Sequence, residues 1–371
     1  MKARIVFYIS GYGFGHAIRQ IEVIKALLDQ APDGIHVVVR TGAPEWLFTR
    51  AIRNSIVVLP GEVDTGVVQL DSLRLDERAT IERASAFYEG LAARLEDEAV
   101  LLREHRADLV VADAPPLACA AAAAAGIASV VCGNFTWDWI YQDYLDVSAD
   151  VPRLIDRIQH LYSLARSGWR LPLHGGFETF SRVEDVPLVA RHASGGRTRD
   201  AVRADLNLPR DSKLALVSFG GYGVRDLPLQ KVDCTGDWRI VITTRAADAP
   251  ALPPGVLAVP EALIRGRGLQ YQDLVHACEV IISKPGYGII SDCVANDAPL
   301  LYTSRGRFSE YDVLVREMPA LLRCRYISMD DFLAGRWRES LEALRATPGP
   351  AVRPRTDGAR VVASKILARL T

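Results

Sequence analysis

Short runs of apolar, mostly β-branched residues recur along the chain and alternate with longer stretches of helical pattern. In the first half these runs are RIVFYI, IHVVVR, SIVVLP, ADLVVAD and IASVVC, and each is apolar almost throughout rather than at every second position. Strands buried on both faces have this continuous pattern, and helices between such strands are typical of parallel sheets. The first half is therefore predicted to be a doubly wound α/β domain.

A polar segment separates the two halves of the chain. It begins after Val189 as ARHASGGRTRDAVRADLNLPRDSK, and its Gly-Gly and Pro are typical of a linker. Beyond it, KLALVSF, WRIVITT, GVLAVP, EVIISK and APLLYTS repeat the earlier pattern. Because 371 residues exceed one ordinary core, we predict two Rossmann-like domains facing across a cleft. The predicted boundaries are 1–190, a linker at 191–212, and 213–371, and they leave open whether the last helix packs back on the first domain.

Composition argues against several classes of protein. Lys and Arg number 44 against 45 Asp and Glu and are scattered, so neither nucleic acid nor a polybasic membrane contact is expected. The most apolar region is interrupted by Asp108, Asp113 and Pro115-Pro116, so no integral membrane segment is predicted. The first apolar run is too short for a signal peptide, and the six dispersed cysteines lack metal-ligand spacing. We expect a cytoplasmic protein with reduced thiols, and a homodimer is left open.

Three glycine-rich turns follow apolar runs: GYGFGH at Gly11–His16, GGYG at Gly220–Gly223 and SKPGYG at Ser283–Gly288. Glycine lets backbone N–H groups approach a phosphate, although it also serves any tight turn. The first turn does not match the dinucleotide fingerprint G-x-G-x-x-G, because its third glycine comes one place early. Arg40 stands where an NAD site has an acidic residue, so NADP is kept only as a minor alternative.

His16 ends the first of these turns, at the carboxyl end of the first predicted strand. Open α/β sheets bind their ligands at this end of the strands, and Asp113 ends another strand of the same domain. A carboxylate that accepts one imidazole N–H fixes the tautomer and makes the ring a better base for a hydroxyl. We predict a catalytic pair of His16 and Asp113. The alternatives are a silent histidine at a helix start and an aspartate that caps a helix.

The third turn is compatible with a site for a diphosphate and a ribose. Lys284 and the N–H groups around Gly286 and Gly288 would meet a diphosphate at a helix start. The Asp292 carboxylate, two turns along, could accept ribose hydroxyls. On spacing alone, a solvated lysine and a surface aspartate explain the pattern equally well.

The aromatic segment NFTWDWIYQDY starts at Asn134 and follows another predicted strand end. Trp137 and the other rings could stack on an acceptor, while Asn134 and Asp138 could bind its hydroxyls; the alternative is that the rings are core. Arg19, one turn into the first predicted helix, could attract an anionic acceptor or pair with an acidic side chain.

The second half of the chain resembles the nucleotide-sugar-binding half of GT-B glycosyltransferases. The donor motif of that family runs from a basic or His residue, through Gly and an aromatic residue, to an acid eight positions on. The resemblance assigns these places to Lys284, Gly286, Tyr287 and Asp292, the last in place of the usual Glu. It also implies a place beside the diphosphate for Gly220, Gly221 and Gly223, and contacts to sugar hydroxyls for Glu310.

The first half resembles the acceptor-side half of the same family. There the histidine after GYGFG deprotonates the acceptor, which implies a general base at His16, its partner at Asp113, and an acceptor lined by Gly13 and Gly15. SGYGFGHAIR, NFTWDWIYQDY, VEDVPLVAR, SFGG and GYGIISDCVANDAPLLY further resemble the amino-terminal, glycosyltransferase-like half of plant L-arabinokinases. The sugar-kinase half has no counterpart in the resemblance, so arabinose kinase activity is not expected.

These resemblances imply an inverting hexosyl- or pentosyltransferase with the GT-B fold. It would move a sugar from a nucleotide diphosphosugar, with a UDP-sugar favoured, to an acceptor hydroxyl, and His16 would be the base. Lys284 and the glycine turns would stabilise the leaving diphosphate, so neither a metal nor another cofactor is expected. The alternatives are a GT-B-shaped epimerase or hydrolase and a non-catalytic nucleotide-sugar sensor. The pair of His16 and Asp113 favours an enzyme.

Overall fold

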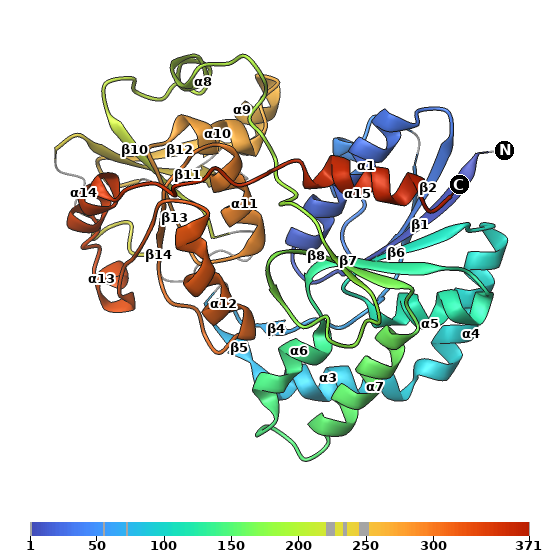
Figure 1. The fold of residues 1–371 in the computed structure, drawn as a ribbon. Coiled ribbons are helices and arrows are strands. Elements are labelled where there is room, and N and C mark those ends of the chain that lie inside the picture. Colours follow the sequence, from blue (N-terminus) through green and yellow to red (C-terminus); the bar gives the residue numbers. More distant parts are fainter. Residues whose placement is uncertain are drawn as a thin grey trace.

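Two parallel β-sheets form the frame of the protein (Figure 1). The computed structural model describes residues 2–54, 56–71, 73–219, 227–232, 236–244 and 252–370. Of the strands in these ranges, seven form a first sheet in the order β3-β2-β1-β6-β7-β8-β9, and six form a second in the order β12-β11-β10-β13-β14-β15. The strand order reverses beside β1 and again beside β10, which is the doubly wound arrangement. The predicted fold class, with two Rossmann-like domains, is confirmed.

The strands of the first sheet are β1 (Ala3–Ile9), β2 (Ile35–Thr41), β3 (Val57–Pro60), β6 (Leu109–Asp113), β7 (Ser129–Phe135), β8 (Ser167–Gly175) and β9 (Val183–Asp185). Those of the second are β10 (Lys213–Val217), β11 (Trp238–Thr244), β12 (Val256–Pro260), β13 (Val280–Ser283), β14 (Leu300–Tyr302) and β15 (Cys324–Tyr326). A separate antiparallel hairpin consists of β4 (Val68–Gln69) and β5 (Leu75–Asp76).

Helices follow most strands and cover both faces of each sheet. In the first domain, defined by the first sheet, they are α1 (Gly15–Gln30), α2 (Trp46–Ala51), α3 (Glu77–Glu89), α4 (Leu91–Glu104), α5 (Pro116–Ala125), α6 (Trp137–Tyr141), η1 (Gln142–Tyr144) and α7 (Val151–Ser163). The later helices are α8 (Arg199–Asp205), α9 (Glu261–Gly266), α10 (Tyr271–Ala277), α11 (Tyr287–Ala295), α12 (Ser309–Glu317), η2 (Met318–Ala320), α13 (Met329–Leu333), α14 (Arg338–Ala346) and α15 (Gly358–Leu367).

Strand β1 shows why the apolar runs are continuous. Ile5, Phe7 and Ile9 belong to an apolar cluster that includes side chains of α1 and α15. Val6 and Tyr8 belong to a second cluster, which includes side chains of α3, α5 and α7. All five residues are fully buried, because a strand in the middle of a doubly wound sheet has no face exposed to water.

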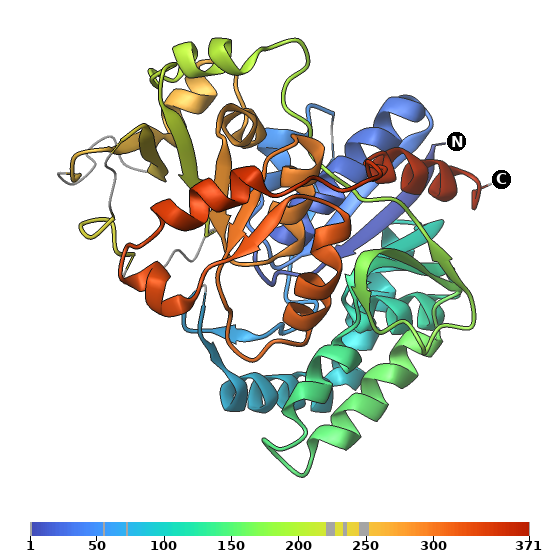
Figure 2. The same cartoon turned by 60° about the vertical axis from the view of Figure 1, so that its left-hand side comes forward.

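The last helix returns to the first domain. Figures 1 and 2 both show α15 beside α1, at the end of a segment that crosses over from the second domain. Val362, Ala363 and Ile366 of α15 lie in the same apolar cluster as β1 and α1.

The two chain crossings between the domains run side by side. Val189 of the first crossing and Asp357 of the second form an antiparallel bridge, and the N–H of Gly358 donates to the carbonyl oxygen of Leu188 at 2.9 Å. A Cβ on Gly358 would lie 2.1 Å from the carbonyl oxygen of Pro187. Only glycine therefore allows the crossings to approach this closely.

A loop of the second domain also reaches the first domain. Phe308 belongs to an apolar cluster of the first domain and stacks on Tyr12 with ring centroids 6.3 Å apart. Nearby, the N–H of Gly306 donates to the carbonyl oxygen of Leu73 at 3.0 Å. The loops between β14 and α12 and around β4 and β5 thus hold the domains together on one side of the cleft.

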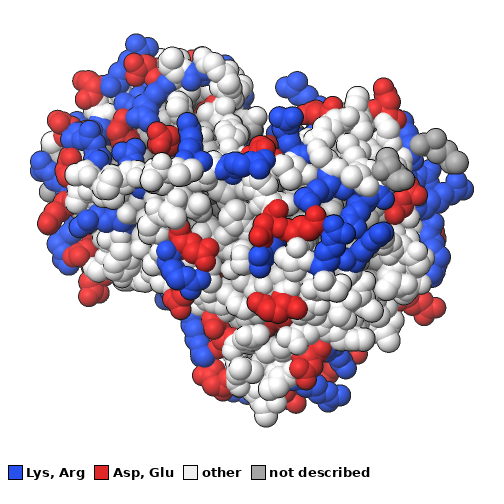
Figure 3. Space-filling model, viewed as in Figure 1, with Lys and Arg blue, Asp and Glu red and all other residues white. Residues whose placement is uncertain are grey.

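The surface carries mixed charge. Figure 3 shows Lys and Arg interspersed with Asp and Glu over the visible face. Among the helices of the described ranges, none has both the length and the apolar character needed to cross a bilayer. The described cysteines, which are Cys119, Cys132, Cys278, Cys293 and Cys324, are free thiols.

Candidate functional site

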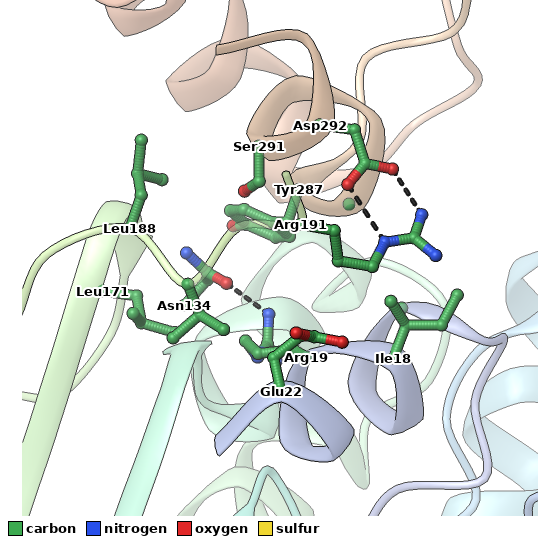
Figure 4. A pocket seen from close by; sticks show the side chains of 13 residues that line it. Ile18, Arg19, Glu22, Asn134, Leu171, Leu188, Arg191, Tyr287, Ser291 and Asp292 are labelled. Carbon is green, nitrogen blue, oxygen red and sulfur yellow. Dashed lines mark hydrogen bonds and ion pairs between the residues drawn. The ribbon is translucent and has the colours of Figure 1, made fainter. Parts of the chain in front are cut away.

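A pocket lies between the two domains, with α1 on one side and α11 on the other (Figure 4). Helix α1 follows β1, and α11 follows β13, and both strands lie where the strand order of their sheet reverses. Ligands of doubly wound sheets bind at such reversal points, beyond the carboxyl ends of the strands. The residues that line the pocket are Gly15, Ile18, Arg19, Glu22, Asn134, Leu171, Leu188, Val189, Arg191, Tyr287, Gly288, Ser291 and Asp292.

His16 and Asp113 are in direct contact beside this pocket. Nδ1 of His16 lies 2.8 Å from Oδ1 of Asp113, and the two side chains are only 7% and 0% exposed. Burial alone would raise the pKa of Asp113, but Arg19 and His16 outweigh it and hold that pKa well below its usual range. Because an ionised carboxylate can only accept, the Nδ1–H of His16 donates, and Nε2 is left as the proton acceptor of the ring.

Other donors fix the Asp113 carboxylate in place. Arg19 donates from Nε to Oδ2 at 2.9 Å and from Nη2 to Oδ1 at 2.6 Å, and Gln20 donates from Nε2 to Oδ2 at 2.8 Å. A paired arginine of this kind sets the orientation of a carboxylate as well as its charge. Arg19 therefore pairs with an acidic side chain, which was one of the two alternatives for it in the sequence analysis. It also lines the pocket.

Asn134 belongs to the same hydrogen-bonded group. Its Oδ1 accepts from Nη1 of Arg19, as Figure 4 shows, and its Nδ2 donates to the carbonyl oxygen of Pro172 at 2.6 Å. The structure thus brings Asn134, Arg19 and Gly15 together at the pocket. Gly13, in the turn just before α1, has a φ of +64°, a conformation that favours glycine.

Trp137 and Asp138 lie in the core of the first domain. Trp137 is fully buried, and its ring meets that of Tyr12 edge to face, with centroids 5.6 Å apart. Asp138 is also buried, and its Oδ2 accepts from Nε2 of Gln159 at 3.3 Å. Burial raises the pKa of Asp138. The described contacts of both residues are with first-domain neighbours, and their binding of an acceptor stays a prediction.

Asp64 is a buried carboxylate that the sequence analysis did not single out. Its Oδ1 accepts from Oγ of Ser10 at 2.9 Å, and its Oδ2 accepts from Nε1 of Trp137 at 2.8 Å. Burial raises the pKa of Asp64 to about 6. The available signal was its position shortly after the apolar run that forms β3, and such a position is too common to indicate a role.

The predicted donor residues of α11 surround the other side of the pocket. Gly286 precedes the helix, and a Cβ on Gly286 or Gly288 would meet nothing within 4 Å, so the approach to the helix start is open. The hydroxyl of Tyr287 is buried with no hydrogen-bond partner in the described part of the chain. Burial and the nearby Arg305 lower the pKa of Lys284 to about 7. The other predicted glycines, Gly220, Gly221 and Gly223, lie outside the described residues.

Asp292 is paired with an arginine from the crossing between the domains. Arg191 donates from Nε to Oδ1 at 3.1 Å and from Nη2 to Oδ2 (Figure 4). The Asp292 side chain is only 4% exposed. Its burial raises its pKa, and Arg191 opposes that rise. Asn296, one turn along α11, donates from Nδ2 to the carbonyl oxygen of Arg191 at 3.0 Å, so the crossing is attached to α11 by both side chain and backbone.

Glu310, at the start of α12, is buried and paired with Arg305 from the preceding loop, whose Nη1 donates to Oε2 at 3.0 Å. Burial raises the pKa of Glu310, whereas Arg305, His16 and Lys284 lower it. Glu310 therefore lies in the same electrostatic environment as the residues predicted for the donor and for the base.

Arg40, the residue considered for an NADP phosphate, is occupied elsewhere. Its Nη2 donates to Oε1 of Glu98 at 2.6 Å, and Oε2 of the same carboxylate accepts from the hydroxyl of Tyr8 at 2.7 Å. An arginine held in this way is a poor candidate for a phosphate ligand. Within the described ranges, no group of three or more His, Cys, Asp or Glu side chains is arranged to hold a metal ion.

Comparison with known proteins identifies a relative and the fold. No model of a known protein family matches the chain. L-arabinokinase from Arabidopsis thaliana is 32% identical over 340 residues, which are 91% of this chain and 31% of that protein. The chain thus spans about a third of the length of the curated relative it matches.

Several solved structures with a similar fold are described as glycosyltransferases. The glycotransferase of kitacinnamycin is 18% identical with a TM-score of 0.64, over 100% of both chains. A UDP-glucosyltransferase from Polygonum tinctorium is 15% identical with a TM-score of 0.62, over 100% of this chain and 98% of that chain. The glycosyltransferase SnogD from Streptomyces nogalater is 17% identical with a TM-score of 0.59, over 100% of both chains. These likenesses show that the chain has the GT-B fold.

Proposed function

We propose that this GT-B protein is a glycosyltransferase, which moves a sugar from a nucleotide diphosphosugar to the hydroxyl of an acceptor with inversion at the anomeric carbon. The observation that carries the proposal is the contact of 2.8 Å between His16 and Asp113. Helix α1, which carries this base, follows the strand at the reversal point of the first sheet, and α11 faces α1 across the pocket.

In the proposed reaction, Nε2 of His16 takes the proton of the acceptor hydroxyl while the acceptor oxygen attacks the anomeric carbon. The new bond to that carbon forms as the bond between the carbon and the diphosphate oxygen breaks, and its electron pair leaves with the diphosphate. Asp113 stays ionised and stabilises the imidazolium, while Arg19 keeps the carboxylate in place. A positioned base of this kind accelerates a reaction about a hundred- to ten-thousand-fold.

The start of α11 would receive the donor diphosphate. The N–H groups of its first turn and the helix dipole favour an anion, and Lys284 adds a cation beside the open glycines. Charge that develops on the leaving diphosphate would be stabilised by these groups, and the proposal includes no metal.

Asp292 would still be able to receive the ribose. A carboxylate has about four lone-pair sites, and Arg191 takes one on each oxygen, which leaves the others for hydroxyls. A UDP-sugar is the favoured donor, in keeping with the UDP-glucosyltransferase among the proteins of similar fold.

The donor site is tested by calorimetry with UDP, GDP, ADP and dTDP, followed by assays of nucleoside diphosphate release from sugar conjugates of the best binder. We expect one of the four to bind with a dissociation constant below about 1 mM. Failure of all four to bind at that level would refute the donor site. Binding without release or transfer for any sugar conjugate would favour the sensor over the enzyme.

The base is tested by His16→Ala, with the exposed His160 of α7 changed to Ala as the matched control. We expect His16→Ala to keep its affinity for the donor and to lose about a hundred- to ten-thousand-fold in rate, while His160→Ala behaves like the wild type. Transfer by His16→Ala at the wild-type rate would remove His16 from the mechanism.

A further inference from the structure

Arg305 lies between Glu310 and the loop that carries Tyr12 and His16. Its side chain is only 6% exposed, and its guanidinium carbon lies 3.8 Å from the ring centroid of Phe308. Nη1 donates to Oε2 of Glu310 at 3.0 Å, and Nη2 donates to the hydroxyl of Tyr12 at 3.4 Å. Since Glu310 is the residue expected to hold sugar hydroxyls, Arg305 stands at the sugar end of the proposed site.

The guanidinium of Arg305 has a donor edge, formed by Nε and Nη2, that is only partly used. Its Nε is buried and has no hydrogen-bond partner among the described residues. Buried polar groups without partners are rare in proteins, and a ligand is one explanation for them. The N–H of Nε is parallel to one N–H of Nη2, and this edge fits the two oxygens of a carboxylate. The contact of Nη2 with Tyr12 is long for a hydrogen bond, so an arriving carboxylate could replace it.

The charges around Arg305 are also unbalanced. The ammonium group of Lys284 acts on Arg305 and Glu310 electrostatically, but it has no hydrogen bond or ion pair with any residue in the described ranges. Asp71 also acts on Lys284, but Arg74 already holds Asp71 from Nη2 at 2.6 Å. The buried guanidinium of Arg305 and the half-buried ammonium group of Lys284 thus share one carboxylate, that of Glu310. Buried charges are normally paired, and a donor diphosphate would pair with Lys284 alone.

We propose that the sugar of the donor carries a carboxylate, and that Arg305 binds it through Nε and Nη2. The substrate class is then a nucleotide diphosphosugar of the uronic acid type. This inference rests on the proposed function and makes its substrate specific. Glu310 accepts from hydroxyls of the same sugar ring, and its neighbour Arg305 selects for the acidic group. Arg305 is a specificity-determining residue in this proposal.

The test is calorimetry with UDP, UDP-glucose and UDP-glucuronate, on the wild type and on Arg305→Gln. We expect the wild type to bind UDP-glucuronate at least about tenfold more tightly than UDP-glucose, as one charge-assisted pair allows. Arg305→Gln should lose this preference and keep its affinity for UDP. If another nucleoside diphosphate is the better binder, its glucose and glucuronate conjugates replace those of UDP.

Arg307→Gln is the matched control, because Arg307 lies in the same loop but is exposed and pairs with Glu77 and Asp146. It should keep the preference. Thermal unfolding shows whether each variant folds. If Arg305→Gln does not fold, Arg305→Lys takes its place in the binding test. It keeps the charge but loses the two-donor edge, so the preference should fall.

Two results would overturn the inference. One is a wild type that binds UDP-glucose as tightly as UDP-glucuronate. The other is an Arg305→Gln variant that loses as much affinity for UDP as for UDP-glucuronate, which would place Arg305 at the diphosphate. Either result would refute this inference alone, whereas failure of every nucleoside diphosphate to bind would refute the proposed function.

Discussion

Replacement of Asp113 by Asn is expected to destabilise the fold and to disable His16. Asp113 is fully buried and accepts from His16, Arg19 and Gln20. Asparagine has nearly the same shape, but one of its two acceptor oxygens becomes an N–H₂ group, which would face these donors. The change also leaves the guanidinium of Arg19 buried without its ionised partner.

The magnitude follows from the burial of this ion pair. Removal of one partner from a buried pair costs about 3–5 kcal/mol in the free energy of unfolding, and the Arg19 side chain is only 9% exposed. Asp185→Asn is the matched control, since Asp185 pairs with Arg170 on the surface and its side chain is 71% exposed. An exposed pair of this kind contributes about 0–1 kcal/mol.

The effect of Asp113→Asn on the free energy of unfolding should depend on pH in a definite direction. Because the pKa of Asp113 is lower in the folded state than in the unfolded state, its ionised form stabilises the fold above the unfolded pKa of about 3.9. That stabilisation is lost as the pH falls through the folded pKa. The difference in stability between the wild type and Asp113→Asn should therefore be largest near neutral pH and should shrink in acid.

The assay is urea unfolding followed by tryptophan fluorescence, near neutral pH and again near pH 3–4, where the shrinkage should begin. Release of nucleoside diphosphate is measured on the same samples, and its rate should fall about as far as in His16→Ala. The reasoning is refuted if Asp113→Asn is as stable as Asp185→Asn near neutral pH, or if the difference does not shrink in acid.

Three further changes have expected outcomes. Gly358→Ala should lower the free energy of unfolding by at least about 2 kcal/mol, because its Cβ would lie 2.1 Å from a carbonyl oxygen. Thermal unfolding measures this loss. The control is Gly195→Ala, whose Cβ would meet nothing within 4 Å and which should leave the free energy of unfolding nearly unchanged. Arg191→Gln should raise the pKa of Asp292 further. Nucleotide binding should then weaken, and it should weaken more in mild acid than in mild alkali. Calorimetry in mild acid and in mild alkali tests this, and an affinity equal to that of the wild type at both pH values would contradict it. Affinity for UDP should fall as the pH rises past about 7, where Lys284 loses its proton, whereas Lys284→Met should bind weakly with little pH dependence.

The frame of the fold could be predicted because its signal is local. Ile5 to Ile9 are apolar at every position, and only a strand covered on both faces needs that pattern. His16 and Asp113 could be placed on one sheet edge for a related reason, since Asp113 ends one such strand and His16 ends the turn that follows another. Their roles in catalysis stay predictions.

The rest depends on packing between distant parts of the chain. Nothing near Asp292 in the sequence indicates that Arg191 will cover it, because that contact depends on where the crossing between the domains lies. Asp64 and Trp137 likewise meet through tertiary structure. The contact of Arg305 with Tyr12 needs the second-domain loop to reach the first domain, and apolar patterning carries no signal for that.

The return of α15 to the first domain has a consequence for synthesis of the chain. The first sheet ends with β9 (Val183–Asp185), yet Val362, Ala363 and Ile366 help to cover one of its faces. During synthesis on the ribosome, one apolar face of the first domain therefore stays exposed until the second domain and α15 have been made. Domains generally fold as units during synthesis, and exposed apolar surface at that stage invites aggregation or chaperones. Nascent chains that stop before α15 should accordingly be more readily digested by protease in their first domain than chains that include it.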